Sequence, residues 1–222
     1  MNTKLIKVGV NMTERSKLSR VSIVIAAAEV ADLNGFDNVT LAAVANRLGV
    51  RNPSLYNHIN GLTELKEQLA IWGTNQLKSI ISEAAIGKAK HEAIYAIAGT
   101  YRSFAHQRPG LYRAILASPD RGNLELKTAI QNMMAVIRTV LEPYCLVEPT
   151  HAVRCLRSLM HGFVSLEAAG WFNAPADKEE SYRYLIATFI NGIESSQQLL
   201  PSSPPAATGD AAGQRTERET KL

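Results

Sequence analysis

Apolar side chains recur every three or four positions along most of this 222-residue chain, and this spacing constrains its fold more than any other feature. Val21, Val24, Ala28 and Ala31, for example, would line one face of an α-helix. No segment shows the apolar–polar alternation that is typical of a half-buried β-strand. The sequence therefore predicts an all-α protein.

Helix-breaking residues divide this pattern into about nine helices. Glycine, asparagine and proline stand where each apolar repeat stops, as they do at the ends of helices. After a first helix that ends at Asn34, the predicted helices cover about 40–48, 53–59, 62–84, 91–107, 109–118, 124–146, 150–172 and 178–200.

The last 22 residues differ in composition from the rest of the chain. Pro, Ser, Ala and Gly dominate after Leu200, and Leu222 is the one large aliphatic residue. Such a segment buries too little apolar surface to offset the entropy lost on ordering. We therefore expect residues 201–222 to form a disordered tail.

Neither a membrane span nor a secretion signal is visible in the sequence. The longest uninterrupted apolar run has six residues, Ile23 to Ala28, whereas a spanning helix needs about 18. Lys4 and Lys7 are not followed by the apolar block of a signal peptide. We expect a cytoplasmic protein that makes no membrane contact.

The two cysteines predict neither a disulfide framework nor a metal site. They lack C-x-x-C spacing, and we expect Cys145 and Cys155 to be buried, unreactive thiols. His151 and Cys155 are four positions apart and would share a helix face, but no further ligand stands near them. The prediction is that the protein holds no metal and no cofactor.

Positive charge is concentrated near the start of the chain. The formal net charge is +4, and residues 1–60 contain seven basic against four acidic side chains. This excess favours a module that binds a polyanion. A soluble surface without such a role is the alternative.

Two short amphipathic segments with a glycine between them follow the first predicted helix. Val44 and Leu48 would face inward from the first segment, and Leu55 and Ile59 from the second. Gly49 allows the sharp turn between them. This arrangement indicates a helix-turn-helix, whose second helix enters the major groove of DNA. An ordinary αα-corner would have a similar turn.

Small and polar side chains occupy the outward positions of the second segment. Asparagine can pair with adenine and arginine with guanine, and proline can touch a thymine methyl group. Hydroxyl and imidazole groups can donate to phosphates, and a threonine before the first segment would cap it. The candidate DNA-binding residues are Thr40, Arg51, Asn52, Pro53, Ser54, Tyr56, Asn57 and His58.

A dense series of motifs runs through residues 17–70. In chain order they are Ala27-Ala28-Glu29, Asn34-Gly35-Phe36, Val39-Thr40-Leu41, Val44-Ala45, Leu48-Gly49-Val50, Pro53-Ser54-Leu55-Tyr56, His58-Ile59 and Leu65. This series resembles the DNA-binding domain of the TetR (tetracycline repressor) family of bacterial transcription regulators. Residues 159–163 with Trp171 are similar to a C-terminal subgroup that has a helical His-Gly-Phe (WHG-type) signature.

The resemblance implies specific roles on DNA. It implies phosphate or backbone contacts for Thr40, Tyr56 and His58, packing on base methyl groups for Pro53, and base reading for Asn52 and Asn57. The family often has a phosphate-binding lysine where this chain has Leu62. Lys66 or the helix N-terminus would replace that contact.

The predicted helices and the resemblance together suggest four parts. These are a helix-turn-helix domain over 12–60, a linking helix over 61–84, a regulatory and dimerisation domain over 85–200, and the tail over 201–222.

The C-terminal domain contains apolar residues that could line a ligand cavity between helices. These candidates are Tyr101, Phe104, Met133, Ile137, Phe163 and Trp171. Arg102, His106 or His161 could supply polar contacts. Plain core packing is the alternative for each apolar residue.

Apolar stripes on the last two predicted helices suit a four-helix bundle between two subunits. The candidate dimerisation residues are Leu156, Met160, Phe163, Leu185, Ile186, Phe189 and Ile193. The resemblance also implies a dimer, because the family dimerises. The alternative is that these stripes face the protein's own core.

These features predict a homodimeric transcriptional regulator, more a repressor than an activator. It would bind an inverted-repeat operator in double-stranded DNA and be released by a small hydrophobic or aromatic ligand. Control by a partner protein, with no small-molecule ligand, is the alternative. A helical enzyme with an αα-corner is a second one, but no catalytic motif is present.

Overall fold

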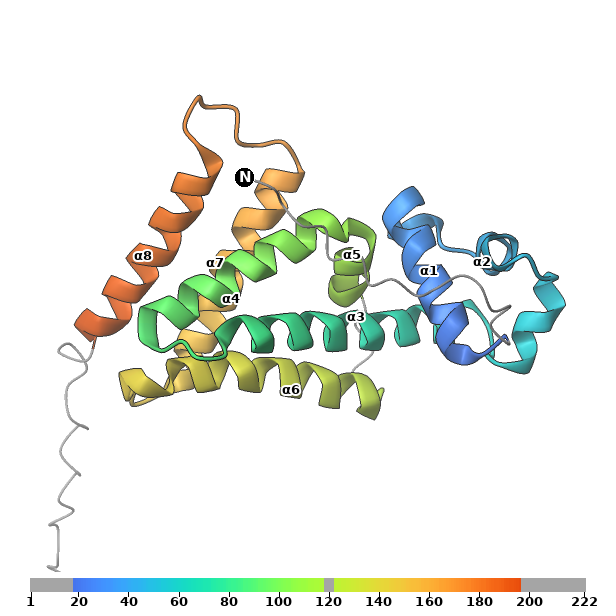
Figure 1. Cartoon of the computed structure of the whole chain (residues 1–222), viewed down its shortest axis with the longest axis horizontal. Coiled ribbons are helices and arrows are strands. Elements are labelled where there is room, and N and C mark those ends of the chain that lie inside the picture. The colour runs from blue at the N-terminus through green and yellow to red at the C-terminus, as the bar shows by residue number, and fades with distance from the viewer. Residues whose placement is uncertain (1–17, 118–121, 197–222) are drawn as a thin grey trace, which may run out of the picture.

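The computed structural model describes residues 18–117 and 122–196, and these residues contain helices and no strands (Figure 1). In chain order the elements are α1 (Arg20–Asn34), η1 (Phe36–Asn38), α2 (Leu41–Leu48), η2 (Asn52–Asn57), α3 (Leu62–Ala85), α4 (Lys90–Gln107), α5 (Pro109–Ala117), α6 (Leu124–Leu141), η3 (Glu142–Tyr144), α7 (Pro149–Ala168) and α8 (Lys178–Ser196), where η marks a 3-10 helix. The prediction of an all-α protein is confirmed. None of the described helices is long and apolar enough to cross a membrane.

The long helix α3 connects the two ends of the molecule (Figure 1). α1, α2 and η2 gather around its N-terminal end, whereas α4, α5 and α6 pack along the rest of it. Leu65 and Leu69 on α3 are buried near the first group, and Leu77 and Ile81 are buried against the second. α7 and α8 lie at the opposite end from α2. One cluster of buried apolar side chains includes residues from each of the helices α1 to α8.

Local caps determine where the first helices begin. Ser19 caps α1, because its hydroxyl accepts a hydrogen bond from the Ser22 amide at 3.1 Å and the Ser22 hydroxyl accepts one from the Ser19 amide. Thr40 caps α2 in the same way through the Ala43 amide. Each cap satisfies amides that a helix N-terminus otherwise leaves unpaired.

The short helix α5 joins the first three helices to the rest of the molecule. Gly110 lies so close to α1 that a Cβ there would be 1.9 Å from the Ala31 carbonyl oxygen. The Asp32 carboxylate accepts hydrogen bonds from Arg108 Nε at 2.5 Å and from the Leu111 amide at 2.9 Å. α1 is therefore fastened directly to the beginning of α5.

Three predicted helices end at different places in the structure. The helix predicted over 124–146 ends at Leu141, because Pro143 has no amide to continue it and lies in η3. The helix predicted over 150–172 ends at Ala168, and Gly170 then turns the chain with a φ of 75°. The segment predicted over 53–59 is the 3-10 helix η2.

Parts of the predicted domain division lie outside the described residues. These are residues 12–17 at the start of the predicted helix-turn-helix domain, residues 118–121 and 197–200 of the predicted regulatory and dimerisation domain, and the predicted tail over 201–222. The division itself stays a prediction.

Candidate nucleic-acid interface

The turn between α2 and η2 has the geometry that its glycine allows. Gly49 has a φ of 67° and a ψ of 28°, in the left-handed region that glycine adopts without strain. The Val50 amide donates to the Ala45 carbonyl at 3.0 Å, which closes the end of α2. The chain therefore reverses within three residues and carries η2 across α2.

Two anchors hold η2 against the core while its other side chains face outward. Leu55 is fully buried and Ile59 is 1% exposed. Arg51, Asn52, Pro53, Tyr56, Asn57 and the capping Thr40 are exposed, and Ser54 and His58 are half-buried. All eight candidate DNA-binding residues therefore lie on α2, η2 or their flanking turns, with polar groups accessible on one side.

Two residues that the sequence analysis missed fasten the end of η2. Arg20 Nε donates to the His58 carbonyl at 3.3 Å, and an Arg20 Nη2 nitrogen lies 2.6 Å from Glu64 Oε1. The other carboxylate oxygen of Glu64 accepts from the Asn60 amide at 2.5 Å. We call Arg20 and Glu64 the clamp. No local sequence signal could reveal it, because its members are 44 positions apart.

Most of the N-terminal positive charge lies outside the described residues. Lys4, Lys7, Arg15 and Lys17 belong to the segment that precedes residue 18. Residues 18–60 contain three arginines and three carboxylates, so this part of the domain is neutral overall. Two of the arginines, Arg20 and Arg47, are already paired with Glu64 and Glu29. Arg51 makes no ion pair within the part of the chain that the structure describes.

The N-terminus of α3 is left uncapped. Gly61 precedes the helix with a φ of 128°, and no side chain accepts a hydrogen bond from its first amides. The Lys66 ammonium group lies over the Phe36 ring, 4.9 Å from its centroid. Lys66 and the helix N-terminus are the two predicted replacements for the family's phosphate-binding lysine, whose position is Leu62 here. Lys66 lies over Phe36, whereas the first amides of α3 have no side-chain cap.

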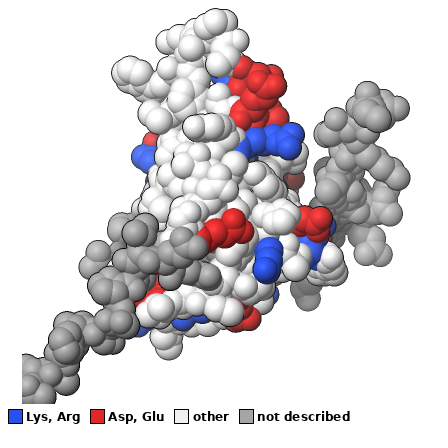
Figure 2. All heavy atoms as spheres, turned by 90° about the vertical axis from the view of Figure 1, so that its left-hand side faces the viewer, with Lys and Arg blue, Asp and Glu red and all other residues white. Residues whose placement is uncertain are grey.

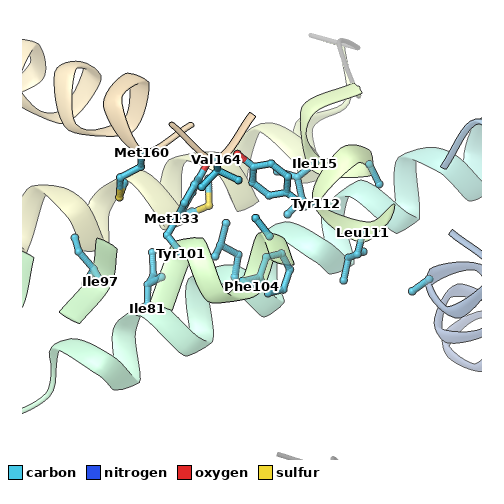
Figure 3. Close-up of a cluster of buried hydrophobic side chains, with 14 of the residues drawn as sticks. Ile81, Ile97, Tyr101, Phe104, Leu111, Tyr112, Ile115, Met133, Met160 and Val164 are labelled. Carbon is cyan, nitrogen blue, oxygen red and sulfur yellow. Dashed lines mark hydrogen bonds between the residues drawn. The ribbon is translucent and has the colours of Figure 1, made fainter. Parts of the chain in front are cut away.

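The candidate ligand residues fall into two groups. Tyr101, Met133 and Ile137 meet at one internal cavity of about 10 Å³, and Phe104 is buried in the same core (Figure 3). Phe163 packs 4.8 Å from Phe172, measured between ring centroids, and lines a surface depression with Trp171. Trp171 is 71% exposed and does not line the cavity. The sequence predicts that Trp171 lies within a helix, whereas α7 ends at Ala168.

Two of the three predicted polar contacts belong to an ion-pair network away from the cavity. Arg102 donates to both carboxylate oxygens of Glu167, at 2.9 and 2.7 Å, and also contacts Glu179. His106 Nε2 donates to Glu167 at 2.8 Å. These bonds, chiefly those from Arg102, lower the pKa of Glu167 to about 2. Only His161 lies near the cavity residues.

The candidate dimerisation residues differ in exposure. Leu156, Met160 and Ile186 are at most 1% exposed and pack within one protomer. Leu185, Phe189 and Ile193 line an open apolar groove of about 740 Å³ between α7 and α8. Phe163 packs on Tyr182 of α8 at 4.9 Å.

Both cysteines are exposed and free, which corrects the prediction that they are buried. Cys145 follows η3 and Cys155 lies on α7, and both line the groove between α7 and α8. Within the described residues no group of three or more His, Cys, Asp or Glu side chains could hold a metal ion.

Comparison with known proteins gives matches across most of the chain. Residues 23–61 match the model of the bacterial regulatory proteins of the tetR family, and residues 94–189 match the tetracyclin repressor-like C-terminal domain. The uncharacterized HTH-type transcriptional regulator YobS of Bacillus subtilis is 37% identical over 184 residues, which are 82% of this chain and 96% of YobS.

Two solved structures are similar in fold. A protein of unknown function from Rhodococcus sp. RHA1 has a TM-score of 0.71 at 18% identity and covers 83% of this chain and 98% of its own. The transcriptional regulator FadR from Bacillus subtilis, in complex with stearoyl-CoA, has a TM-score of 0.62 at 14% identity over 78% of this chain and 98% of its own.

Proposed function

Because the chain belongs to the TetR family of DNA-binding transcriptional regulators, we propose that it represses genes by binding an inverted-repeat operator as a homodimer. Members of this family regulate transcription and are not enzymes. Because the proposed target of this protein is DNA, we expect the protein to act in the cytoplasm.

The exposed face of η2 is the observation that carries this proposal. Leu55 and Ile59 fix the segment from inside, and the clamp of Arg20 and Glu64 fixes its end. A reading segment that is fixed in this way can present its side chains to base edges without a large loss of entropy on binding. In this proposal Arg51 and Asn52 reach base edges and Tyr56 reaches a phosphate.

The groove between α7 and α8 supports the homodimer. An open groove lined mostly by apolar side chains is a surface on which a second subunit can bury apolar area. The side of the molecule that carries α8 shows few charged side chains (Figure 2), as expected for the core of an interface. A two-fold axis here would place two η2 segments on half-sites about one DNA turn, roughly 34–36 Å, apart.

A small molecule that binds the C-terminal domain would release the operator. FadR, which has this fold, was solved with stearoyl-CoA, so the architecture can accommodate a ligand. A ligand changes DNA affinity only if it favours one spacing of the two η2 segments. The internal cavity of about 10 Å³ holds no more than about one water, so the ligand must displace side chains. Control by a partner protein is the second candidate, and this tight packing favours it.

The test measures DNA binding by purified protein. Operator sequences selected from random duplexes should be inverted repeats, and log affinity should fall linearly with log salt by roughly 0.9 per phosphate contact. Tyr56→Phe should weaken all sequences about equally, whereas Arg51→Ala should change the preferred base at one position, by about 1–3 kcal/mol. Affinity that is independent of salt and of both substitutions would overturn the proposal.

A further inference from the structure

Three polar side chains form a chain beside the internal cavity. The hydroxyl oxygens of Tyr101 and Tyr112 are 2.9 Å apart, and the Tyr112 oxygen is 2.7 Å from His161 Nδ1. The three residues come from α4, α5 and α7. Tyr101 and Tyr112 lie among buried apolar side chains (Figure 3), and His161 is half-buried. Tyr101 is 5% exposed and also lines the cavity. Tyr101 therefore belongs both to the cavity lining and to the hydrogen-bonded chain.

Arg157 contributes a positive charge to the same place. It is half-buried, lines the cavity from α7, and makes no ion pair within the part of the chain that the structure describes. Burial lowers the pKa of His161, and the charge of Arg157 lowers it further. Burial also raises the pKa of Tyr101. The hydrogen bond from Tyr112 and the charge of Arg157 act in the opposite direction and lower it. The charge of Arg157 therefore lies close to the polar chain.

A half-buried cation without a carboxylate partner is unfavourable, because it loses hydration and gains no countercharge. The network of Arg102, Glu167 and Glu179 shows the contrast, since each of its charges has an opposite partner. The rest of the cavity wall is apolar and includes Met133, Met134 and Met160. The site therefore combines an unmatched positive charge and a hydroxyl group with an apolar surround.

We propose that the C-terminal domain binds a small amphipathic carboxylate, with the acid group on Arg157 and Tyr101 and the apolar tail among the three methionines. This inference rests on the proposed ligand control and names the chemistry of the ligand. Either tautomer of His161 can be accommodated, because each hydroxyl of the chain can donate in either direction. With Nδ1 protonated, His161 donates to Tyr112, Tyr112 donates to Tyr101, and the Tyr101 hydroxyl is left to donate to the carboxylate.

The space for the tail must come from movement of side chains. The present cavity of about 10 Å³ is too small for any ligand larger than water. Methionine has three rotatable bonds and adapts its shape at low energetic cost, so three of them around one cavity form a wall that can open. A short unbranched tail suits such a wall better than a rigid ring system.

The experiment compares octanoate with 1-octanol, which has the same tail length and no charge. Binding to the full chain is measured by titration calorimetry, without DNA. We expect octanoate to bind at least about tenfold more tightly than 1-octanol, as the loss of a charge-assisted hydrogen bond predicts. Arg157→Gln should weaken octanoate binding by a similar factor and leave 1-octanol unchanged. Arg154→Gln, an exposed arginine one turn away, is the matched control and should change neither.

Circular dichroism of Arg157→Gln verifies that the variant is folded. Equal binding of octanoate and 1-octanol, undiminished octanoate binding by Arg157→Gln, or no octanoate binding by the wild-type chain would each overturn the inference. Operator binding measured in parallel separates it from the proposed function. Octanoate that binds without releasing the operator contradicts ligand control and leaves the site intact, whereas normal operator binding without octanoate binding contradicts only the site.

Discussion

The carboxylate of Glu167 belongs to an ion-pair network that connects α4 with α7 and α8. Glu167 of α7 is 6% exposed, and it accepts hydrogen bonds from Arg102 and His106 of α4. Arg102 reaches on to Glu179 at the start of α8. A buried carboxylate that is fully paired stabilises the fold, but it does so only while it is ionised.

Acid should therefore destabilise the protein in a defined range. The folded-state pKa of Glu167 is about 2, below its ordinary value of 4.5. The stabilisation is complete above pH 4.5 and is lost as the pH falls from 4.5 toward 2, up to about 3 kcal/mol. Glu167→Gln should lower the free energy of unfolding at pH 7 by a similar amount and flatten its pH dependence in that range. Urea unfolding at several pH values measures both.

Glu92→Gln is the control, because Glu92 is exposed and has no ion-pair partner among the described residues. Its effect should stay within about 0.5 kcal/mol. Equal acid sensitivity of the wild-type chain and Glu167→Gln would show that the carboxylate does not stabilise the fold as argued.

At the scale of elements, α5 packs on both α1 and α3 and so joins the first helices to the rest of the molecule. It packs on α1 through Gly110 and on α3 through Gly73, where a Cβ would lie 2.8 Å from Leu111 Cδ1. Tyr112, which lies beside the proposed carboxylate site, is on this same helix. We therefore expect a displacement of α5 to shift α1 and, with it, the proposed DNA-reading segment η2.

Gly110→Ala should separate α1 from α5. Its Cβ would be 1.9 Å from the Ala31 carbonyl oxygen, which is backbone and cannot rotate away. We expect a loss of about 3 kcal/mol or more in the free energy of unfolding and weaker operator binding. Thermal unfolding and a DNA titration measure these changes.

Gly99→Ala on α4 provides the comparison. No atom lies within 4 Å of a Cβ at that position, so alanine should raise stability by up to about 1 kcal/mol through its higher helix propensity. If Gly110→Ala behaves like Gly99→Ala, the close contact between α1 and α5 is not required for folding.

At the scale of the whole molecule, the proposed dimer depends on the groove between α7 and α8. Leu185 is half-buried and lines the groove, whereas its neighbour Ile186 is 1% exposed and belongs to the protomer's own core. Two adjacent residues of one helix thus belong to two different environments. A charge at each position should have different consequences.

Leu185→Glu should give a folded monomer, because the charge lies in the proposed interface and water can reach it once the subunits separate. Ile186→Glu should unfold the protein. Light scattering measures the mass, and circular dichroism measures the helix content. Tyr184→Glu, at a position that is 77% exposed and outside the groove, should leave the dimer intact. A folded wild-type monomer at micromolar concentration, or a dimeric Leu185→Glu, would contradict this assembly.

The helices and the reading segment could be predicted from the sequence because their causes are local. Thr40 caps α2 from a distance of three residues, and Gly49 turns the chain where no other residue does so without strain. Leu55 and Ile59 are spaced to be buried together, which leaves the residues between them outward. Interactions between residues a few positions apart depend mainly on the local sequence, so the pattern of residues records them.

Only the tertiary structure decided which distant residues meet. Arg20 and Glu64 form the clamp, Arg157 lines the cavity with Tyr101, and Trp171 lies outside it because α7 ends at Ala168. A periodic apolar stripe shows that a helix is buried on one face but does not specify the neighbouring helix. That choice depends on how all the helices fill the core together, and spacing along one helix carries no information about it.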